Sequence, residues 1–198
     1  MTSQTLLVLI QLTLSFIYDG RTIAYAAEAN SCEHEMILAA KRYDVPLAVL
    51  YAIGLTETQR RGSLQPFALN VDGVSLFPAT LGEALQQFAG AKKRGEKLID
   101  VGCMQINHYF HRRHFRSLEA MFDPHENVNY AAHFLKELKS REGSWTLAAA
   151  RYHAGPTNAP NQKRYVCLVI ANMVTSGFGG WTPSARAFCD RPTPQPGP

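Results

Sequence analysis

The chain has 198 residues, of which 46% are hydrophobic and 18% are charged, so its composition excludes a disordered polymer and indicates one globular domain. The formal net charge of +4 is mildly basic, which suits an anionic polymer as a partner. The basic residues are too few and too scattered to indicate nucleic-acid binding, and the densest run, Lys92-Lys93-Arg94, is interpreted as a solvated helix face.

Residues 1–26 are predicted to form a cleavable signal peptide. Leu6 to Ile17 is an almost unbroken apolar run, and its twelve residues are too few to span a bilayer as a helix. Ala24-Tyr25-Ala26 matches the small-x-small cleavage signal, with Ala29 as a second position for cleavage. The alternative is a buried N-terminal helix, which Tyr18 to Arg21 would interrupt. A cleaved leader predicts a periplasmic protein without a stable membrane span.

Two helices and a loop are predicted next. Residues 33–43 place Met36, Ile37 and Ala40 on one face, which is the spacing of an amphipathic helix. Asp44 is expected to cap a second helix that ends near Glu57. Residues 62–78 carry two prolines, two glycines and an Asp72-Gly73 turn signal, so they predict a loop, with or without a short hairpin.

Local start signals define two of the later helices. Thr80 and Glu83 have the spacing of a capping box and predict a helix that runs to about Arg94. Asp123-Pro124 offers an acidic cap followed by proline at the first helical position. Further helices are predicted over 145–152 and 163–174, and residues 100–107 are expected to form a tight turn that enters a helix.

The order of these elements predicts one mainly α domain over residues 27–176. Residues 177–198 are rich in glycine and proline and are predicted to be a disordered tail.

The chain has four cysteines: Cys32, Cys103, Cys167 and Cys189. None belongs to a CxxC pair, so a zinc site is not expected. In an exported chain, an even number of cysteines predicts up to two disulfides, and all three pairings are open. A bond to Cys189 would tether the tail.

Four sequence blocks occur in order along the chain. They are GLTET at 54–58, GCMQIN at 102–107, FDPHENV at 122–128 and ARYHAG at 150–155. These blocks resemble, in the same order, the conserved blocks of the soluble lytic transglycosylase (SLT) family, whose fold is lysozyme-like. The resemblance covers the chain from about Cys32 to Ile170, and it implies that Glu57 is the catalytic acid/base.

The sequence departs from the family pattern at two block positions and in one spacing. Thr58 stands where the family usually has serine, and His153 stands where it usually has asparagine. Residues 60–97 resemble an insertion found in one subfamily, which carries an Asn-x-x-Gly loop and a helix. Asn70-Val71-Asp72-Gly73 fits that loop.

The resemblance implies cleavage of the β-1,4 bond between N-acetylmuramic acid and N-acetylglucosamine in peptidoglycan. Glu57 would protonate the leaving oxygen and then deprotonate the C6 hydroxyl, which closes a 1,6-anhydro ring. A proton-donating carboxyl must be partly withdrawn from water, and the apolar stretch before Glu57 allows this. No metal and no organic cofactor are expected.

The substrate-binding residues that the resemblance implies are Thr58, Gln105, Asn127, Tyr152, His153 and Tyr165. Structural alternatives remain open for several of them. Gln105 could cap the backbone, Tyr152 could belong to the core, and Asn127 could be a polar residue at a helix start. A structural role is equally open for Tyr165.

Two other functions compete with the transglycosylase. A muramidase of the same fold would need a group that activates water, and Asp72 and Asp100 are the candidates. A glycan-binding or assembly module would not cut at all. Peptidoglycan strands are the expected partner, and resemblance also allows a secretion or conjugation apparatus. We expect a monomer.

Overall fold

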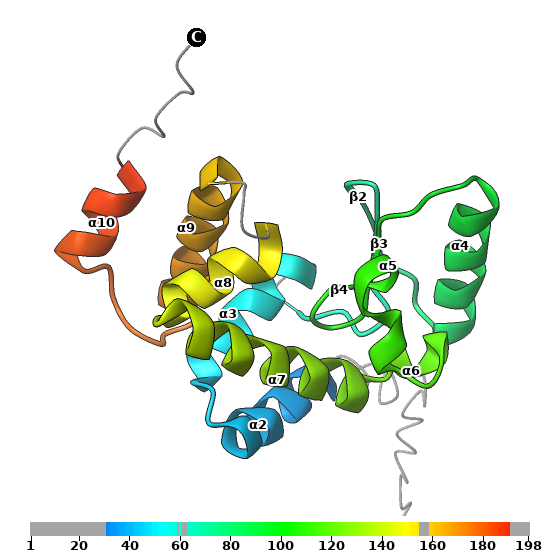
Figure 1. Cartoon of the computed structure of the whole chain (residues 1–198), viewed down its shortest axis with the longest axis horizontal. Coiled ribbons are helices and arrows are strands. Elements are labelled where there is room, and N and C mark those ends of the chain that lie inside the picture. The colour runs from blue at the N-terminus through cyan, green and yellow to red at the C-terminus, as the bar shows by residue number, and fades with distance from the viewer. Residues whose placement is uncertain (1–30, 59, 61–62, 155–158, 191–198) are drawn as a thin grey trace, which may run out of the picture.

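The computed structural model describes residues 31–58, 60, 63–154 and 159–190, and its fold is mainly helical with one small sheet, as predicted. In Figure 1, helices α2, α3, α7, α8 and α9 gather on one side, and the sheet lies with α4, α5 and α6 on the other. The predicted signal peptide, residues 1–26, lies outside the described residues. Among the described residues, no helix is both long and apolar enough to cross a membrane.

Helix α3, Leu47–Thr58, forms the centre of the helical side. Seven of its twelve residues are buried, because it packs between α2, Ser31–Tyr43, and α9, Ala159–Thr175. Gly54 allows this close approach, since a Cβ at that position would collide with the Met36 side chain of α2. The expected cap at Asp44 is wrong: Asp44 has φ +52, and its carboxylate pairs with Lys136 at 2.8 Å.

Helix α7, Pro124–Glu142, begins as its sequence predicts. The Asp123 side chain accepts a hydrogen bond from the Glu126 amide at 3.0 Å, with proline at the first helical position. The helix ends at Gly143, whose φ of +79 is the left-handed conformation of a C-terminal cap.

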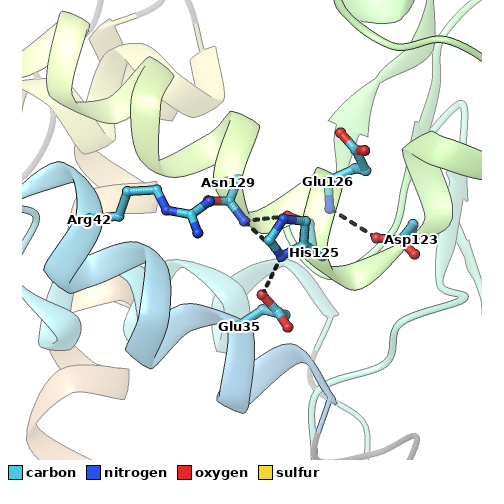
Figure 2. Close-up of polar contacts among 6 residues, drawn as sticks. All are labelled: Glu35, Arg42, Asp123, His125, Glu126 and Asn129. Carbon is cyan, nitrogen blue, oxygen red and sulfur yellow. Dashed lines mark hydrogen bonds and ion pairs between the residues drawn. The ribbon is translucent and has the colours of Figure 1, made fainter.

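Polar side chains fasten α7 to α2, as Figure 2 shows. Arg42 donates to Asn129 Oδ1 at 2.8 Å, and His125 Nδ1 lies 2.8 Å from Glu35 Oε2. Asn129 in turn donates to the His125 carbonyl at 2.7 Å. These contacts satisfy the polar atoms at the edge of an otherwise apolar helix interface.

The sheet is antiparallel, with the strand order β2-β1-β3-β4. Its strands are β1, Leu69–Val71; β2, Val74–Leu76; β3, Ile99–Val101; and β4, Ile106–Asn107. The β1–β2 hairpin turns at Asp72 and Gly73, which both have positive φ, as a two-residue hairpin turn requires. Of the two readings left open for residues 62–78, the loop with a hairpin is therefore the observed one.

The tight turn expected within residues 100–107 is observed at residues 102–105, and a helix follows it, but the prediction missed the two strands that flank the turn. That segment contains the end of β3 and all of β4, which pair through Val101 and Ile106. Helix α5, His108–His111, then starts at Asn107, whose side chain caps it.

Three helical segments complete the sheet side. Helix α4, Leu81–Lys93, starts at Thr80 and shows the predicted capping contacts: Thr80 accepts from the Glu83 amide, and Glu83 accepts from the Ala79 amide. The 3₁₀ helix η1, Arg112–His114, follows α5, and α6, Leu118–Phe122, precedes α7.

The C-terminal part holds α8, Trp145–Ala154, then α9, and then α10, Pro183–Asp190. The prediction of a disordered tail is therefore wrong for residues 183–190, while residues 191–198 lie outside the described part. A disulfide between Cys167 and Cys189 joins α10 to α9, and a second joins Cys32 to Cys103. The structure thus selects one of the three open pairings.

Candidate active site

A cleft of about 940 Å³ lies between the helical side and the sheet. The helical side contributes Glu57 of α3, Phe134 of α7, Arg151 to Ala154 of α8 and Asn161 of α9. The sheet side contributes Asn70, Asp72, Gly73, Leu98, Asp100, Gln105 to Asn107, Phe110 and His111. The cleft therefore collects polar side chains from both sides of the fold, on helices, strands and the loops between them.

Glu57 lies in the last turn of α3, and its side chain is only 15% exposed. The Tyr165 hydroxyl donates to its Oε1 at 2.6 Å, and His153 Nδ1 lies 3.6 Å from the same oxygen. The His153 ring stacks on the Tyr165 ring with centroids 4.1 Å apart and planes 5° apart. Both contacts use Oε1, so the carboxyl is held through that oxygen.

Tyr165 is a buried hydrogen-bond donor. Its side chain comes from α9 and is only 3% exposed. Burial raises its pKa well above the ordinary value, and the nearby Glu57 carboxyl adds to the shift. The phenol therefore stays protonated and donates to Glu57, which places Tyr165 in contact with the candidate acid and out of the open cleft.

Tyr152 and Gln105 line the cleft and also brace the loop at residues 102–105. The Tyr152 hydroxyl donates to the Met104 carbonyl at 2.7 Å, and burial raises the pKa of this phenol well above its usual range. Gln105 Nε2 donates to the carbonyls of Ala68 and Gly102, both at 3.0 Å. Because Nε2 serves those two carbonyls, the amide offers its oxygen to the cleft.

Thr58 and Asn127 do not contact the cleft, which corrects their prediction as substrate-binding residues. Both side chains are fully buried. The Thr58 hydroxyl donates to the Gly54 carbonyl at 3.1 Å, inside α3. Asn127 accepts from the Met104 amide and donates to the carbonyls of Val101 and Met121. They position the residues that carry the site.

A second carboxyl, Asp100 of β3, faces the same cleft as Glu57. Asn107 Nδ2 donates to Asp100 Oδ1 at 2.6 Å. Burial raises the pKa of Asp100 to about 6; the Asn107 hydrogen bond opposes this shift, and the charge of Glu57 adds to it. Asp72 also lines the cleft, from the turn of the β1–β2 hairpin.

Several groups in the cleft wall were not predicted as site residues, among them Asn107, Phe110 and Arg151. Asn107 had a signal, because it closes the GCMQIN block. Arg151 had the same kind of signal, because it lies in the ARYHAG block. Phe110 had none, since an exposed aromatic residue on a short helix is an ordinary surface feature.

Within the described part of the chain, no cluster of three or more His, Cys, Asp or Glu side chains could hold a metal ion. The polar groups of the cleft wall are the mostly buried Glu57 carboxyl, two aspartate carboxyls, two imidazoles, the Arg151 guanidinium, and amide and phenol groups. Its carboxyl and imidazole groups are suited to proton transfer at a polar substrate.

The chain was compared with protein families, curated proteins and solved structures. A family model described as "Transglycosylase SLT domain" matches residues 35–167, which is more than half of the chain. No curated protein and no solved structure matches.

Proposed function

The chain belongs to the transglycosylase SLT domain family, of the lysozyme-like lytic transglycosylases, and we propose from this that Glu57 is its catalytic acid/base. Membership supports an enzyme that acts on peptidoglycan outside the cytoplasm. The bond cleaved is the β-1,4 bond between N-acetylmuramic acid and N-acetylglucosamine, and the product is a 1,6-anhydro-muramic acid end.

The observation that carries this proposal is the single-sided contact of the Glu57 carboxyl. Tyr165 donates to Oε1 at 2.6 Å, which fixes the carboxyl and favours protonation on Oε2. Glu57 lines the cleft, so that proton faces the space where a sugar would lie. With Glu57 only 15% exposed, bulk water competes little for it.

Two proton transfers complete the reaction. Glu57 gives its proton to the glycosidic oxygen as the bond from that oxygen to muramic C1 breaks, and the N-acetylglucosamine side leaves with a hydroxyl. The muramic N-acetyl oxygen supports the positive centre at C1. The Glu57 carboxylate then takes the proton from the C6 hydroxyl, whose oxygen bonds to C1. Glu57 ends protonated, and no water is consumed.

Neighbouring groups have defined parts in this scheme. Tyr165 stabilises the carboxylate that exists between the two transfers, because a hydrogen bond to a charged oxygen is stronger than one to a neutral oxygen. His153 stacks on Tyr165 and limits its rotation. Gln105 and Tyr152 shape the cleft next to the acid and contact the sugar.

One observation favours a second candidate, a muramidase. Asp100 lines the same cleft, and a second carboxylate there could activate water. In that case water and not the C6 hydroxyl would attack C1, so the products would carry a reducing end.

Mass spectrometry of muropeptides released from purified peptidoglycan tests the proposal. Products ending in 1,6-anhydro-muramic acid, one water lighter than the reducing form, are expected. Reducing-end products would establish the muramidase, and a folded protein that releases nothing would favour a binding module. The Glu57→Gln variant is expected to lose roughly 10²- to 10⁴-fold in rate, and full activity in that variant would overturn the assignment of the acid.

The cellular setting follows the same reasoning. We propose that a cleaved signal peptide carries the chain to the periplasm, where it acts as a monomer in wall remodelling or in local opening of the wall. An envelope-spanning secretion or conjugation machine is the proposed partner of that opening. Detection of the mature N-terminus after residue 26 in the periplasmic fraction tests the first step.

A further inference from the structure

The positive charge of the chain is concentrated in residues 92–116. This segment contains seven Lys or Arg and two Asp or Glu, which gives +5, whereas the whole chain has 20 Lys or Arg and 16 Asp or Glu, which gives +4. The rest of the chain is therefore close to neutral, at −1. A chain that reads as mildly basic overall thus has a strongly basic part and a balanced remainder.

The fold brings the two basic runs of this segment together. Lys92, Lys93 and Arg94 lie at the end of α4, and the second run lies on η1 and after it. The rings of Phe88 on α4 and His108 on α5 lie with centroids 4.8 Å apart. Burial lowers the pKa of His108, and the positive charges of Arg112 and Lys92 lower it further, because both lie close to that ring.

We define the basic wall as the exposed Lys and Arg side chains of these two runs: Lys92, Lys93, Arg94, Lys97, Arg112, Arg113 and Arg116. These side chains make few contacts with carboxylates. Within the described residues, Arg116 pairs with Glu126 at 3.8 Å. Most of the charge therefore faces solvent and is available to an anionic partner.

The basic wall is continuous with the rim of the cleft. Leu98, Phe110 and His111 line the cleft, and Lys97 and Arg112 are their direct neighbours in the chain. Phe110 is 64% exposed and packs edge-on against Tyr109, with ring centroids 5.1 Å apart. In Figure 1, α4 and α5 lie together on the side of the molecule that holds the sheet.

We propose that the basic wall binds the carboxylates of the stem peptides carried by the glycan strand, and that the enzyme therefore prefers peptide-bearing strands to bare glycan. This inference rests on the proposed function. The sugar backbone offers the wall no counter-charge once the lactyl groups are capped by peptide, whereas each stem carries free carboxylates. The charges that the wall presents thus match the peptide part of the polymer.

A pair of charge-reversal variants tests the proposal. Lys97→Glu with Arg113→Glu removes two positive charges of the basic wall, and both residues are exposed. Lys41→Glu with Arg141→Glu is the matched control, because it changes the net charge equally at exposed positions outside the cleft lining. Neither pair includes a residue assigned to the chemistry of the site.

Binding is measured by co-sedimentation on ice with two substrates: purified peptidoglycan strands, and the same strands after an amidase has removed the stem peptides. The lactyl carboxylates that the amidase exposes are converted to neutral methylamides, so that the stripped strands carry no counter-charge for the basic wall. The basic-wall variant is expected to bind peptide-bearing strands roughly tenfold more weakly than the unmodified protein, with a smaller salt dependence. On stripped strands the two are expected to bind equally, and the control variant is expected to match the unmodified protein on both.

Three results would overturn the proposal. They are an equal loss of binding on both substrates, an equal loss in the control variant, and tighter binding to anionic phospholipid vesicles or to DNA than to peptide-bearing strands. Binding needs no cleavage, so its outcome is separate from that of the proposed function. If the protein binds strands through their stem peptides but forms no anhydro product, the catalytic proposal fails and the binding proposal for the basic wall is supported.

Discussion

Tyr165 is the side chain on which the setting of Glu57 most depends. Its hydroxyl contacts Glu57 Oε1 at 2.6 Å, while its ring is held by the stacked His153. A phenol that stays protonated is a fixed donor, and a fixed donor stabilises a carboxylate more than a carboxylic acid. The contact therefore matters most when Glu57 has given up its proton.

Tyr165→Phe is expected to lower kcat/KM for peptidoglycan cleavage by roughly tenfold to a hundredfold, since a hydrogen bond to a charged group contributes about 1.5–3 kcal/mol. Tyr51→Phe is the matched control, because it removes a hydroxyl that contacts Glu33 at 3.2 Å, outside the cleft. Rates are measured by release of soluble muropeptides. Equal effects of the two substitutions would contradict the role given to Tyr165.

Asp100 is predicted to make the stability of the fold depend on pH. Its folded pKa of about 6 lies above the ordinary value of about 3.9, so the native state binds more protons than the unfolded state between these values. The free energy of unfolding should therefore fall by up to about 2–3 kcal/mol as pH rises from 4 to 6, and then stay level.

Asp100→Asn should remove this loss, because the neutral amide can still accept the hydrogen bond from Asn107. Urea denaturation of both proteins between pH 3.5 and 8 measures the difference. Between pH 4 and 6, the free energy of unfolding of the variant should become increasingly larger than that of the unmodified protein. Parallel curves over the whole range would show that Asp100 does not titrate as stated.

At the scale of elements, one loop beside the cleft is held by several other elements. Residues 102–105 join β3 to β4, and they are held from three directions. Asn127 of α7 bonds the Met104 amide, Tyr152 of α8 bonds the Met104 carbonyl, and the Cys32–Cys103 disulfide joins the loop to α2. Gly102 has φ +80 and touches the Asn127 side chain, where a Cβ would collide.

Asn127→Ala is expected to lower the free energy of unfolding by about 3 kcal/mol, because it leaves the Met104 amide and the carbonyls of Val101 and Met121 buried without partners. Gln87→Ala, at an exposed position on α4, should change stability by less than about 0.5 kcal/mol. The midpoint of urea denaturation reports both. If the Asn127 substitution changed the free energy of unfolding as little as the Gln87 substitution, Asn127 would not stabilise the loop as stated.

At the scale of the whole molecule, the two disulfides constrain parts of the chain that differ greatly in size. Cys32–Cys103 spans 71 residues and joins the first helix described to the centre of the sheet side. Cys167–Cys189 spans 22 residues and holds α10, in which no residue is buried, against α9. Loop closure in the first therefore stabilises the domain, whereas the second tethers one helix.

Replacing Cys32 and Cys103 by alanine is expected to lower the free energy of unfolding by about 4 kcal/mol. Replacing Cys167 and Cys189 by alanine should leave the unfolding of the domain almost unchanged, because α10 adds little buried surface. In that variant, faster hydrogen exchange is expected within residues 183–190. Equal destabilisation by the two pairs would contradict this division.

The sequence by itself determined the mainly α class, the family, and the helix starts at Thr80 and Asp123. Those helix starts rest on contacts between residues three or four positions apart, so the chain encodes them locally. It also supplied the residues of the cleft wall that belong to the family blocks. Glu57, Gln105, Tyr152 and His153 were named from those blocks, and all four line the cleft.

Only the tertiary structure decided the features that depend on distant partners. The short strands β1 and β3 form because they pair across 28 to 32 positions of the chain, and no local pattern encodes that pairing. Thr58 and Asn127 are buried and support the site from inside, because neighbouring elements cover them. Asp44 does not cap helix α3, because its carboxylate pairs with Lys136. The cysteine pairing, helix α10 and the basic wall have the same origin. Burial and charge clustering are properties of segments brought together in space, which a local sequence pattern does not contain.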